Sequence, residues 1–196
     1  TKETGFYLAS GGDFAAIPGL PIVYWLSEKV RAAFAKAGDG YSLGAACGIA
    51  QGLTTGDNGR FLRLWWEVSR SDSEFDRDPS ATTPTKAWQS CDKGGDFRRW
   101  FGNNHWVIRW LNDGHEIITF PGSTPRNLGT RFKPSIACTK ISSGGVSFRA
   151  HDRGFVFTDA AVSGTGDGGL DSILGFVNSS TASRMMAAVA PTLNFE

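Results

Sequence analysis

The sequence predicts an α+β fold made mainly of antiparallel hairpins and a β-meander, with an N-terminal amphipathic helix and two short C-terminal helices. Three observations support this prediction. Apolar residues recur at helical spacing only towards the two ends of the chain. The middle alternates short β-branched and aromatic runs with turns of Gly, Asn, Asp and Ser. The 196 residues are 40% hydrophobic and 12% aromatic, which is enough to bury a substantial core.

The N-terminal elements are a short strand and a helix. Gly5–Ser10 predicts the strand, and the helix is expected from about Pro21 to Ala37. Proline suits the first turn of a helix, and Gly38 is placed to cap its C-terminus. The charged side chains on the opposite face are expected to contact water. The apolar positions at helical spacing are Ile22, Leu26, Val30, Ala33, Phe34 and Ala37.

A glycine-rich turn opens the central region. Gly52–Gly59 contains Thr-Thr and Asp-Asn pairs, and a strand is expected to follow at Phe61–Val68. The turn lacks the lysine of a phosphate-binding P-loop, so it is interpreted as structural. Ser71–Ala87 is polar and predicts a surface loop.

An Asp-Gly turn signal follows. Trp106–Leu111 and His115–Phe120 flank Asn112-Asp113-Gly114, which predicts a β-hairpin. Three further strands and two helices complete the chain. The expected strands are Ser135–Ile141, Val146–Ala150 and Phe155–Thr158, and the expected helices are Leu170–Val177 and Thr181–Val189.

Composition limits the functions that the chain can carry. The 20 basic and 19 acidic residues leave a formal net charge of +1, so any binding of an anionic partner must come from a local patch. Cys47, Cys91 and Cys138 are widely spaced and form no C-x-x-C pair, which indicates reduced thiols. We find no apolar run of membrane-spanning length and no signal peptide, and we expect a cytoplasmic protein with no membrane partner.

One stretch combines features suited to binding. Asp92–Trp110 contains a Gly-Gly pair, a Gly-Asn-Asn turn, several large aromatics and four cations. Arginine and lysine bind anions, and tryptophan and phenylalanine can stack on flat ligands. The stretch is compatible with a nucleic-acid surface or with an ordinary hairpin. Its four cations are Lys93, Arg98, Arg99 and Arg109.

The sequence offers little support for catalysis or metal binding. His105, His115 and His151 do not have the spacing of a zinc site, and no G-x-S-x-G motif is present. We therefore predict no catalytic residue and no metal in this chain. Scattered carboxylates are expected to cap turns; they include Asp57, Asp92, Asp96 and Glu116.

Longer blocks carry a resemblance to one family. In order along the chain, they are Ile17–Glu28, Gln51–Val68, Asp92–Trp100, Trp110–Gly114 and Pro191–Glu196. They resemble the region that follows the catalytic domain in PglX (BrxX) adenine-specific DNA methyltransferases of BREX phage-defence systems. The Thr-Gly-Asp-Asn element at residues 55–58 is also similar to one that opens the target-recognition region of single-chain restriction-modification methylases.

The resemblance implies a function for a longer parent protein. The parent would transfer a methyl group from S-adenosylmethionine to N6 of adenine in duplex DNA, after flipping the base. The family's Asn-Pro-Pro-Tyr motif and Gly-rich cofactor loop are absent here, so this segment is expected to be non-catalytic and without a cofactor. We expect residues 1–40 to link to the methyltransferase domain, residues 41–165 to form a β-rich target-recognition core, and residues 166–196 to form a helical segment.

The resemblance also guides the expected contacts with duplex DNA. Cys138 stands where the family usually has tryptophan, so the surface formed by Ser135–His151 is placed among the variable, base-reading parts. Candidates for contacts to the DNA backbone are Arg63, Lys93, Arg98 and Arg99. Candidates for base reading are Lys140, Arg149, His151 and Arg153.

Two other classes of function remain open at this stage. The segment could dock other phage-defence proteins or phage inhibitors through exposed aromatics. It could also be a tryptophan-rich, carbohydrate-binding β-domain. Affinity for duplex DNA that falls steeply with salt would favour DNA reading over both.

Overall fold

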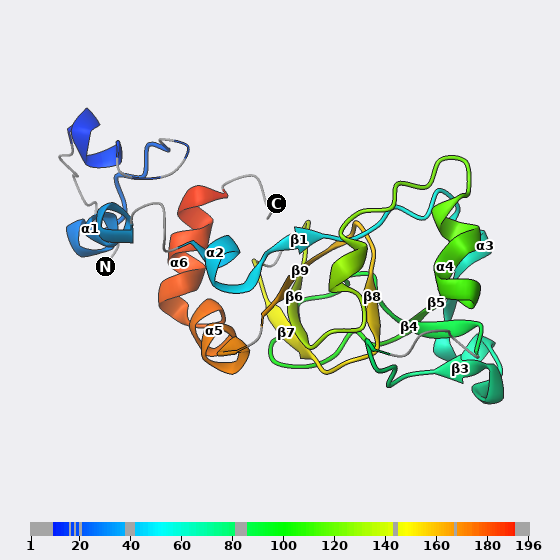
Figure 1. The fold of residues 1–196 in the computed structure, drawn as a ribbon. Coiled ribbons are helices and arrows are strands. Elements are labelled where there is room, and N and C mark those ends of the chain that lie inside the picture. The colour runs from blue at the N-terminus through cyan, green and yellow to red at the C-terminus, as the bar shows by residue number, and fades with distance from the viewer. Residues whose placement is uncertain are drawn as a thin grey trace.

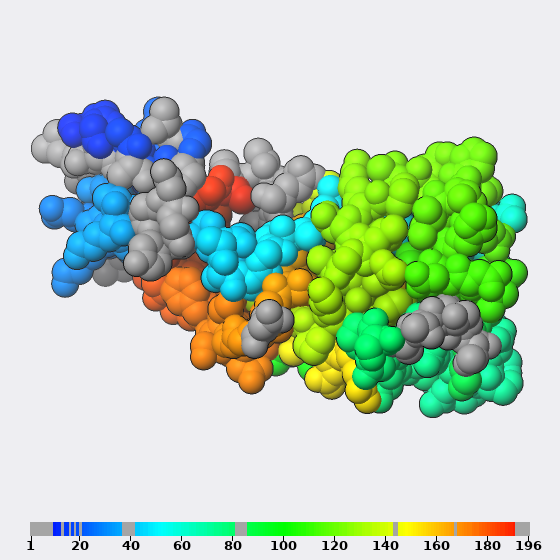
Figure 2. Space-filling model, in the orientation of Figure 1, coloured from blue at the N-terminus to red at the C-terminus, as the bar shows by residue number. Residues whose placement is uncertain are grey.

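A computed structural model describes residues 10–15, 17, 19, 21–37, 42–80, 86–142, 145–166 and 168–190. The molecule is elongated: a β-rich body lies at one end, the N-terminal helix α1 at the other, and the helices α5 and α6 between them (Figures 1 and 2). The strand expected at Gly5–Ser10, the cap at Gly38 and the block Pro191–Glu196 lie wholly or almost wholly outside the described residues.

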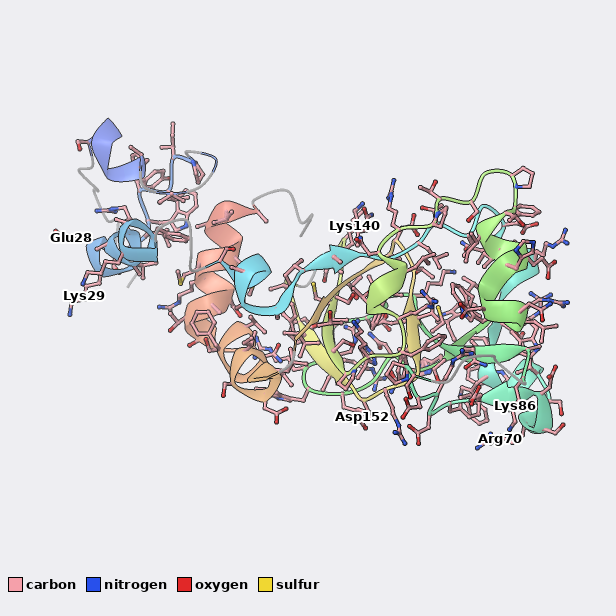
Figure 3. All side chains as sticks on the ribbon, viewed as in Figure 1. Glu28, Lys29, Arg70, Lys86, Lys140 and Asp152 are labelled. Carbon is pink, nitrogen blue, oxygen red and sulfur yellow. The ribbon has the colours of Figure 1, made fainter. Side chains whose placement is uncertain are left out.

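The N-terminal helix is shorter than the sequence predicts. α1 spans Glu28–Ala37, and it begins after a turn in which the Leu26 amide donates to the Val23 carbonyl. Ser27 provides the start signal, because its hydroxyl and carbonyl oxygens both accept from the Val30 amide. Pro21 is therefore outside the helix. Figure 3 shows Glu28 and Lys29 at the far end of the molecule from the β-rich body.

A four-stranded antiparallel sheet has the order β1-β9-β6-β7. One face is apolar and packs against α2 and α5 through a cluster that includes Ile136, Cys138 and Phe148. The other face carries polar and small residues, since successive side chains alternate across a strand. The strands are β1 (Ala50–Gln51), β6 (Ser135–Thr139), β7 (Phe148–His151) and β9 (Ala161–Thr165).

A second sheet is built around β4 (Trp88–Asp92). One edge of β4 pairs with β5, and β5 pairs in turn with β2, both in antiparallel register. The other edge pairs in parallel with β3 near its start and with β8 near its end. The remaining strands are β2 (Leu62–Leu64), β3 (Ser73–Glu74), β5 (Trp106–Arg109) and β8 (Phe155–Phe157).

The α+β class with β-hairpins is confirmed, but one expected hairpin and several connections differ. β6 and β7 form the expected hairpin, but the next strand, β8, leaves to pair with β4 in the other sheet. A further strand that the sequence did not predict, β9, returns to pair with β6. The strand expected at Phe61–Val68 is confined to β2, and the chain then turns into the 3₁₀ helix Trp65–Glu67.

The hairpin expected around Asn112-Asp113-Gly114 is wrong. After β5, the chain forms α4 (Leu111–Ile118) instead of a second strand. Residues 112–114 have left-handed backbone angles, which reverse the chain before the helical turn that follows. The physical reason lies in Trp110, which is completely buried and whose ring packs directly against Gly114.

The helical segments follow the sequence more closely. α5 (Leu170–Val177) has the expected bounds, and α6 (Ser180–Val189) begins one residue earlier because Ser179 caps it. Leu174 and Val177 are buried, and Val189 is exposed. Two short helices flank β1 in sequence: α2 (Leu43–Cys47), capped by Ser42, comes before it, and α3 (Asn58–Phe61), capped by Asp57, comes between β1 and β2.

Candidate nucleic-acid interface

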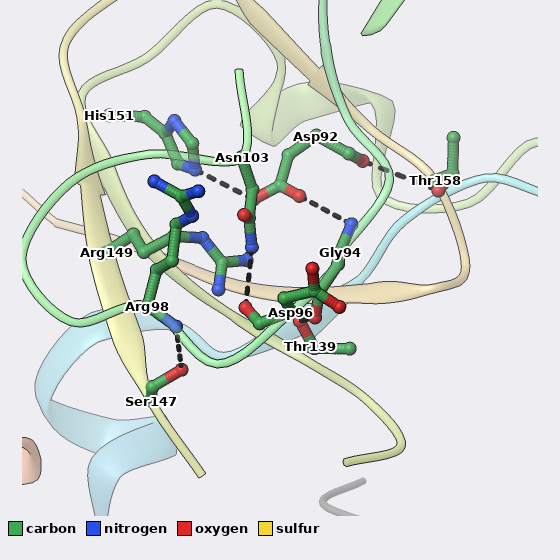
Figure 4. Close-up of polar contacts among 11 residues, drawn as sticks. Asp92, Gly94, Asp96, Arg98, Asn103, Thr139, Ser147, Arg149, His151 and Thr158 are labelled. Carbon is green, nitrogen blue, oxygen red and sulfur yellow. Dashed lines mark hydrogen bonds and ion pairs between the residues drawn. The ribbon is translucent and has the colours of Figure 1, made fainter. Parts of the chain in front are cut away.

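Asp92, at the end of β4, is the centre of a buried polar cluster (Figure 4). Its Oδ2 atom lies 2.7 Å from His151 Nε2 and 3.3 Å from Arg149 Nη2. Its Oδ1 atom accepts from the Gly94 amide at 2.6 Å. The side chains of Asp92, Arg149 and His151 are all 0% exposed. The cluster joins the two sheets, because Asp92 belongs to one sheet and its two side-chain partners to the other.

The strand register explains how the cluster is assembled. Arg149 and His151 are two residues apart on β7, so they share a face of the four-stranded sheet. On the facing strand β6, Ala137 lies opposite Arg149 and Ser135 lies opposite His151. The small Ala137 side chain leaves room for the long arginine between the sheets.

The cluster favours an ionised carboxylate. Burial alone would raise the pKa of Asp92, but the hydrogen bond from His151, the charges of His151 and Arg149, and the Gly94 amide together lower that pKa. The opposing charges are necessary here, because an isolated buried ion is strongly disfavoured. Asp92 therefore does more than the turn capping that the sequence predicts: it neutralises a buried arginine.

The loop that follows Asp92 is held along the edge of β7. The Trp100 amide donates to the Phe148 carbonyl at 3.0 Å, and the Ala150 amide donates to the Trp100 carbonyl at 2.9 Å. The Arg98 amide donates to Ser147 Oγ at 3.1 Å. These bonds occupy backbone groups of an edge strand. They also fix the backbone of the loop in place.

The outer side of this loop presents cations and aromatic rings. We call the segment Phe97–Phe101 the Arg-aromatic loop. All five of its side chains are exposed, and the Arg99 guanidinium stacks over the Phe97 ring at 5.3 Å. Trp65 and Trp66 are two further exposed rings, and the Trp66 ring contacts His105, the last residue of the connection that contains the loop. The surface can offer both charge and stacking to a ligand.

The structure gathers some of the predicted backbone-contact residues and separates others. Arg98 and Arg99 project from the Arg-aromatic loop. Lys93 is half-buried, with its Nζ atom 4.3 Å from the centre of the Trp106 ring. Arg63 donates to the carbonyl oxygens of Gly59 and Leu62. Its strand position, opposite Val107, places it on the other face of the sheet from Trp106.

The predicted base-reading residues are not brought together on one surface. Arg149 and His151 are buried against Asp92, so in this structure neither side chain can reach a base edge. Their assignment to base reading is therefore corrected: both are core residues. Arg153 is exposed but is bonded to Asp76 and Asp78. Lys140 follows β6 and lies at the opposite end of the hairpin from Asp152 (Figure 3).

Sequence reasoning missed two features of the site. The exposed Trp65 and Trp66 were assigned to a strand. Neighbouring residues of a strand point to opposite faces of the sheet, so both faces would have to cover a large ring. The Asp92 cluster has no local signal, since its members come from strands of two different sheets that are distant in sequence.

The described residues show no group of three or more His, Cys, Asp or Glu side chains that could hold a metal ion. Cys47, Cys91 and Cys138 are buried and unbridged, and burial raises the pKa of the Cys138 thiol to about 12. Within the same part of the chain, none of the helices is both long and apolar enough to cross a bilayer.

The fold and the site together define a small α+β module that presents a cationic, aromatic loop from a rigid polar base. Comparison with known proteins shows which proteins contain a similar segment. No family model matches the chain. It is 31% identical to "Adenine-specific methyltransferase PglX" of Lacticaseibacillus casei (strain Zhang) over 199 residues, which cover 97% of this chain and 16% of that protein. It is 32% identical to "Adenine-specific methyltransferase BrxX" of Escherichia coli O9:H4 (strain HS) over 188 residues, which cover 93% of this chain and 15% of that protein.

These matches confirm the resemblance expected from the sequence. The chain is similar to these two methyltransferases over nearly its whole length. It spans about a sixth of the length of the curated relatives that it matches, with 16% and 15% of each covered. It is therefore related to one segment of adenine-specific methyltransferases.

Proposed function

We propose that this chain is the DNA target-recognition segment of an adenine-specific DNA methyltransferase of the restriction-modification or BREX phage-defence type. The parent would use S-adenosylmethionine to methylate N6 of adenine in duplex DNA. One observation carries the proposal: a chain that matches adenine-specific methyltransferases along 97% of its length presents Arg98 and Arg99 on a fixed, exposed loop. Backbone phosphates favour cationic side chains, and positioned arginines fix register on DNA.

In this proposal, the chain contributes binding and no catalytic group. Among the described residues, neither of two surface cavities suits that cofactor. The larger of these two has a volume of about 230 Å³, below the ~300–1,000 Å³ usual for ligands of that size. It is also lined by Arg77, Arg131 and Lys133, which would repel the positive sulfonium of S-adenosylmethionine. Cofactor binding is accordingly assigned to other parts of the parent.

The exposed rings suggest the mode of contact. Phe97, Trp100 and Phe101 flank the two arginines, and aromatic rings next to cations are typical of sites that hold unstacked bases. A flipped target base leaves its neighbours partly unstacked. We propose that the arginines contact phosphates and that the exposed rings contact bases near the flipped position.

The test is the double substitution Arg98→Ala with Arg99→Ala. We expect binding to weaken by a similar factor on all duplex sequences. The slope of log affinity against log salt should fall by about 1.8, which corresponds to two lost phosphate contacts. Fluorescence anisotropy with labelled duplexes measures both quantities.

The matched control is Lys29→Ala with Lys36→Ala on α1. It also removes two positive charges, but from exposed positions at the far end of the molecule. If both double variants lose affinity equally, the effect is one of net charge and the loop is not the interface. Unchanged affinity and salt slope in the loop variant would also contradict the proposal.

A protein-docking function is the second candidate, and the exposed aromatics favour it. Trp65, Trp66 and Phe101 are 48%, 56% and 70% exposed, and such rings are enriched at protein interfaces. Binding through them would depend weakly on salt. The salt slope measured above therefore separates the two functions.

A further inference from the structure

A second cationic site lies in a cavity of about 230 Å³, away from the Arg-aromatic loop in sequence. Two segments form its walls, one ending at Pro79 and the other running from Leu128 to Lys133. Figure 2 shows these segments side by side on the visible face, green against yellow-green. The described residues that line it are Arg77, Pro79, Asp113, Leu128, Gly129, Arg131, Phe132 and Lys133.

The charges that line this cavity are unbalanced. Three cations, Arg77, Arg131 and Lys133, face one carboxylate, Asp113. The Asp113 carboxylate lies 2.9 Å from Arg131 Nη2 and 3.8 Å from Arg77 Nη2. One negative charge therefore serves two of the cations, and the described lining residues carry a formal net charge of +2. A small anion is the ligand that this excess favours.

Arg77 makes the site rigid. Its side chain is 2% exposed, and its guanidinium stacks over the Phe132 ring at 4.5 Å. Phe132 is itself fixed, because its amide donates to the Phe155 carbonyl at 2.7 Å. Holding a cationic group so deeply is costly unless an anion offsets its charge. Asp113 is one group that offsets this charge, and it also pairs with Arg131.

Nearby carboxylates are occupied elsewhere. Asp76 and Asp78 flank Arg77 in sequence, but both are bonded to Arg153, with closest distances of 2.6 Å and 3.3 Å. They do not line the cavity. Lys133 is exposed at the rim, where its flexible side chain can close on a ligand.

We propose that this cavity binds a phosphate-type oxyanion through Arg77, Arg131 and Lys133. Arginine pairs with such anions through two parallel hydrogen bonds, and lysine contributes a point charge. The volume suits a single small ion or one phosphate group better than a larger ligand. The group could come from a DNA backbone or from free phosphate. The site goes beyond the proposed function, since it does not require the Arg-aromatic loop to contact DNA.

The first test uses inorganic phosphate as the probe. Amide NMR spectra of the chain are recorded during titration with phosphate, and separately with chloride at matched ionic strength. We expect saturable shifts at Gly129 and Phe132 with phosphate alone. Lys133→Gln should weaken phosphate binding by roughly threefold to tenfold, as for the loss of one charge-assisted hydrogen bond at an exposed position. Its control is Lys86→Gln, which removes an equal charge outside the cavity.

Equal shifts with phosphate and chloride, or an unchanged phosphate affinity in Lys133→Gln, would overturn the proposal. Lys133 is chosen because it is exposed and its replacement should leave the fold intact. Arg131→Gln provides a second variant, and the NMR spectrum itself shows whether that variant is folded.

A DNA-binding measurement then identifies the source of the phosphate. If the cavity holds a backbone phosphate, Lys133→Gln should lower the salt slope of duplex binding by about 0.9, and free phosphate should compete with DNA. If it holds a free ion, the NMR shifts persist and DNA binding is unchanged. Because the shifts are measured without DNA, failure of this site and failure of the Arg-aromatic loop can be told apart.

Discussion

At the residue scale, Asp92 is the group on which the candidate interface depends. It is the only carboxylate among the described residues that is bonded to both Arg149 and His151, and all three side chains are 0% exposed. Its Oδ1 atom also fixes the Gly94 amide, where the loop leaves the sheet. A single side chain therefore joins the two sheets and sets the start of the connection that carries Arg98 and Arg99.

Asp92→Asn should destabilise the protein by about 3–5 kcal/mol, because it leaves the charge of Arg149 buried without its partner. Urea unfolding followed by circular dichroism measures the change. The control is Asp152→Asn, an exposed carboxylate close to the cluster in sequence, which should change stability by less than about 0.5 kcal/mol. Equal effects of the two substitutions would show that the buried pair contributes nothing.

The cluster of Asp92 with His151 and Arg149 also makes stability depend on pH. The pKa of Asp92 is lower in the folded protein than in the unfolded chain, where it is about 3.9. Its stabilising contribution is therefore fully present above that value and is lost as the pH falls towards the folded pKa. Urea midpoints of Asp92→Asn should fall less steeply with acidification than those of the unmodified protein.

At the element scale, the reversal inside α4 shows how packing overrides a local signal. Gly114 has a φ of 77°, and a Cβ atom there would lie 2.7 Å from the Trp110 ring. Asn112 and Asp113 are also left-handed, which these two residue types tolerate better than most. The turn residues were predicted correctly, but the buried Trp110 directs the chain into a helix instead of a second strand.

Gly114→Ala should destabilise the protein by about 1–3 kcal/mol, since it combines a strained backbone with a steric clash. Gly175→Ala on α5 is the matched control. That glycine is exposed and helical and has no atom within 4 Å of an added Cβ, so alanine should stabilise by about 0.5–1 kcal/mol. Thermal unfolding of the two variants should shift in opposite directions. A neutral Gly114→Ala would refute the packing explanation.

The elements predicted best are those with local signals. α5 and α6 follow from their apolar spacing, and the β6–β7 hairpin follows from the turn between its strands. The parallel pairing of β8 with β4 is non-local, and no periodicity indicates which strand a short apolar run will join. For the same reason, Arg149 and His151 read as surface residues: the sequence does not show that Asp92 covers their face.

At the scale of the whole molecule, separate apolar clusters occupy its different parts. One belongs to the sheet that contains β4 and includes the completely buried Phe61, Ile108 and Trp110. Another joins the N-terminal region to α6 through Ile17, Val23, Leu26 and Ala188. The Arg-aromatic loop is supported by the sheet that contains β4 and by the Asp92 cluster. The N-terminal region depends on α6, so the two ends of the molecule should be separable in stability.

Ala188→Glu tests this separation. Ala188 is 1% exposed, and a charged side chain there should disrupt the N-terminal cluster without reaching the sheets. Hydrogen exchange should quicken at amides of α1 and stay unchanged in β4, β5 and β8. Ala187→Glu is the matched control. Ala187 is the preceding residue of the same helix and is exposed, so its replacement should leave exchange in both regions unaltered. Faster exchange in β4 in the Ala188 variant would show that the molecule unfolds as one unit, and DNA binding through the loop would then depend on the N-terminal contacts as well.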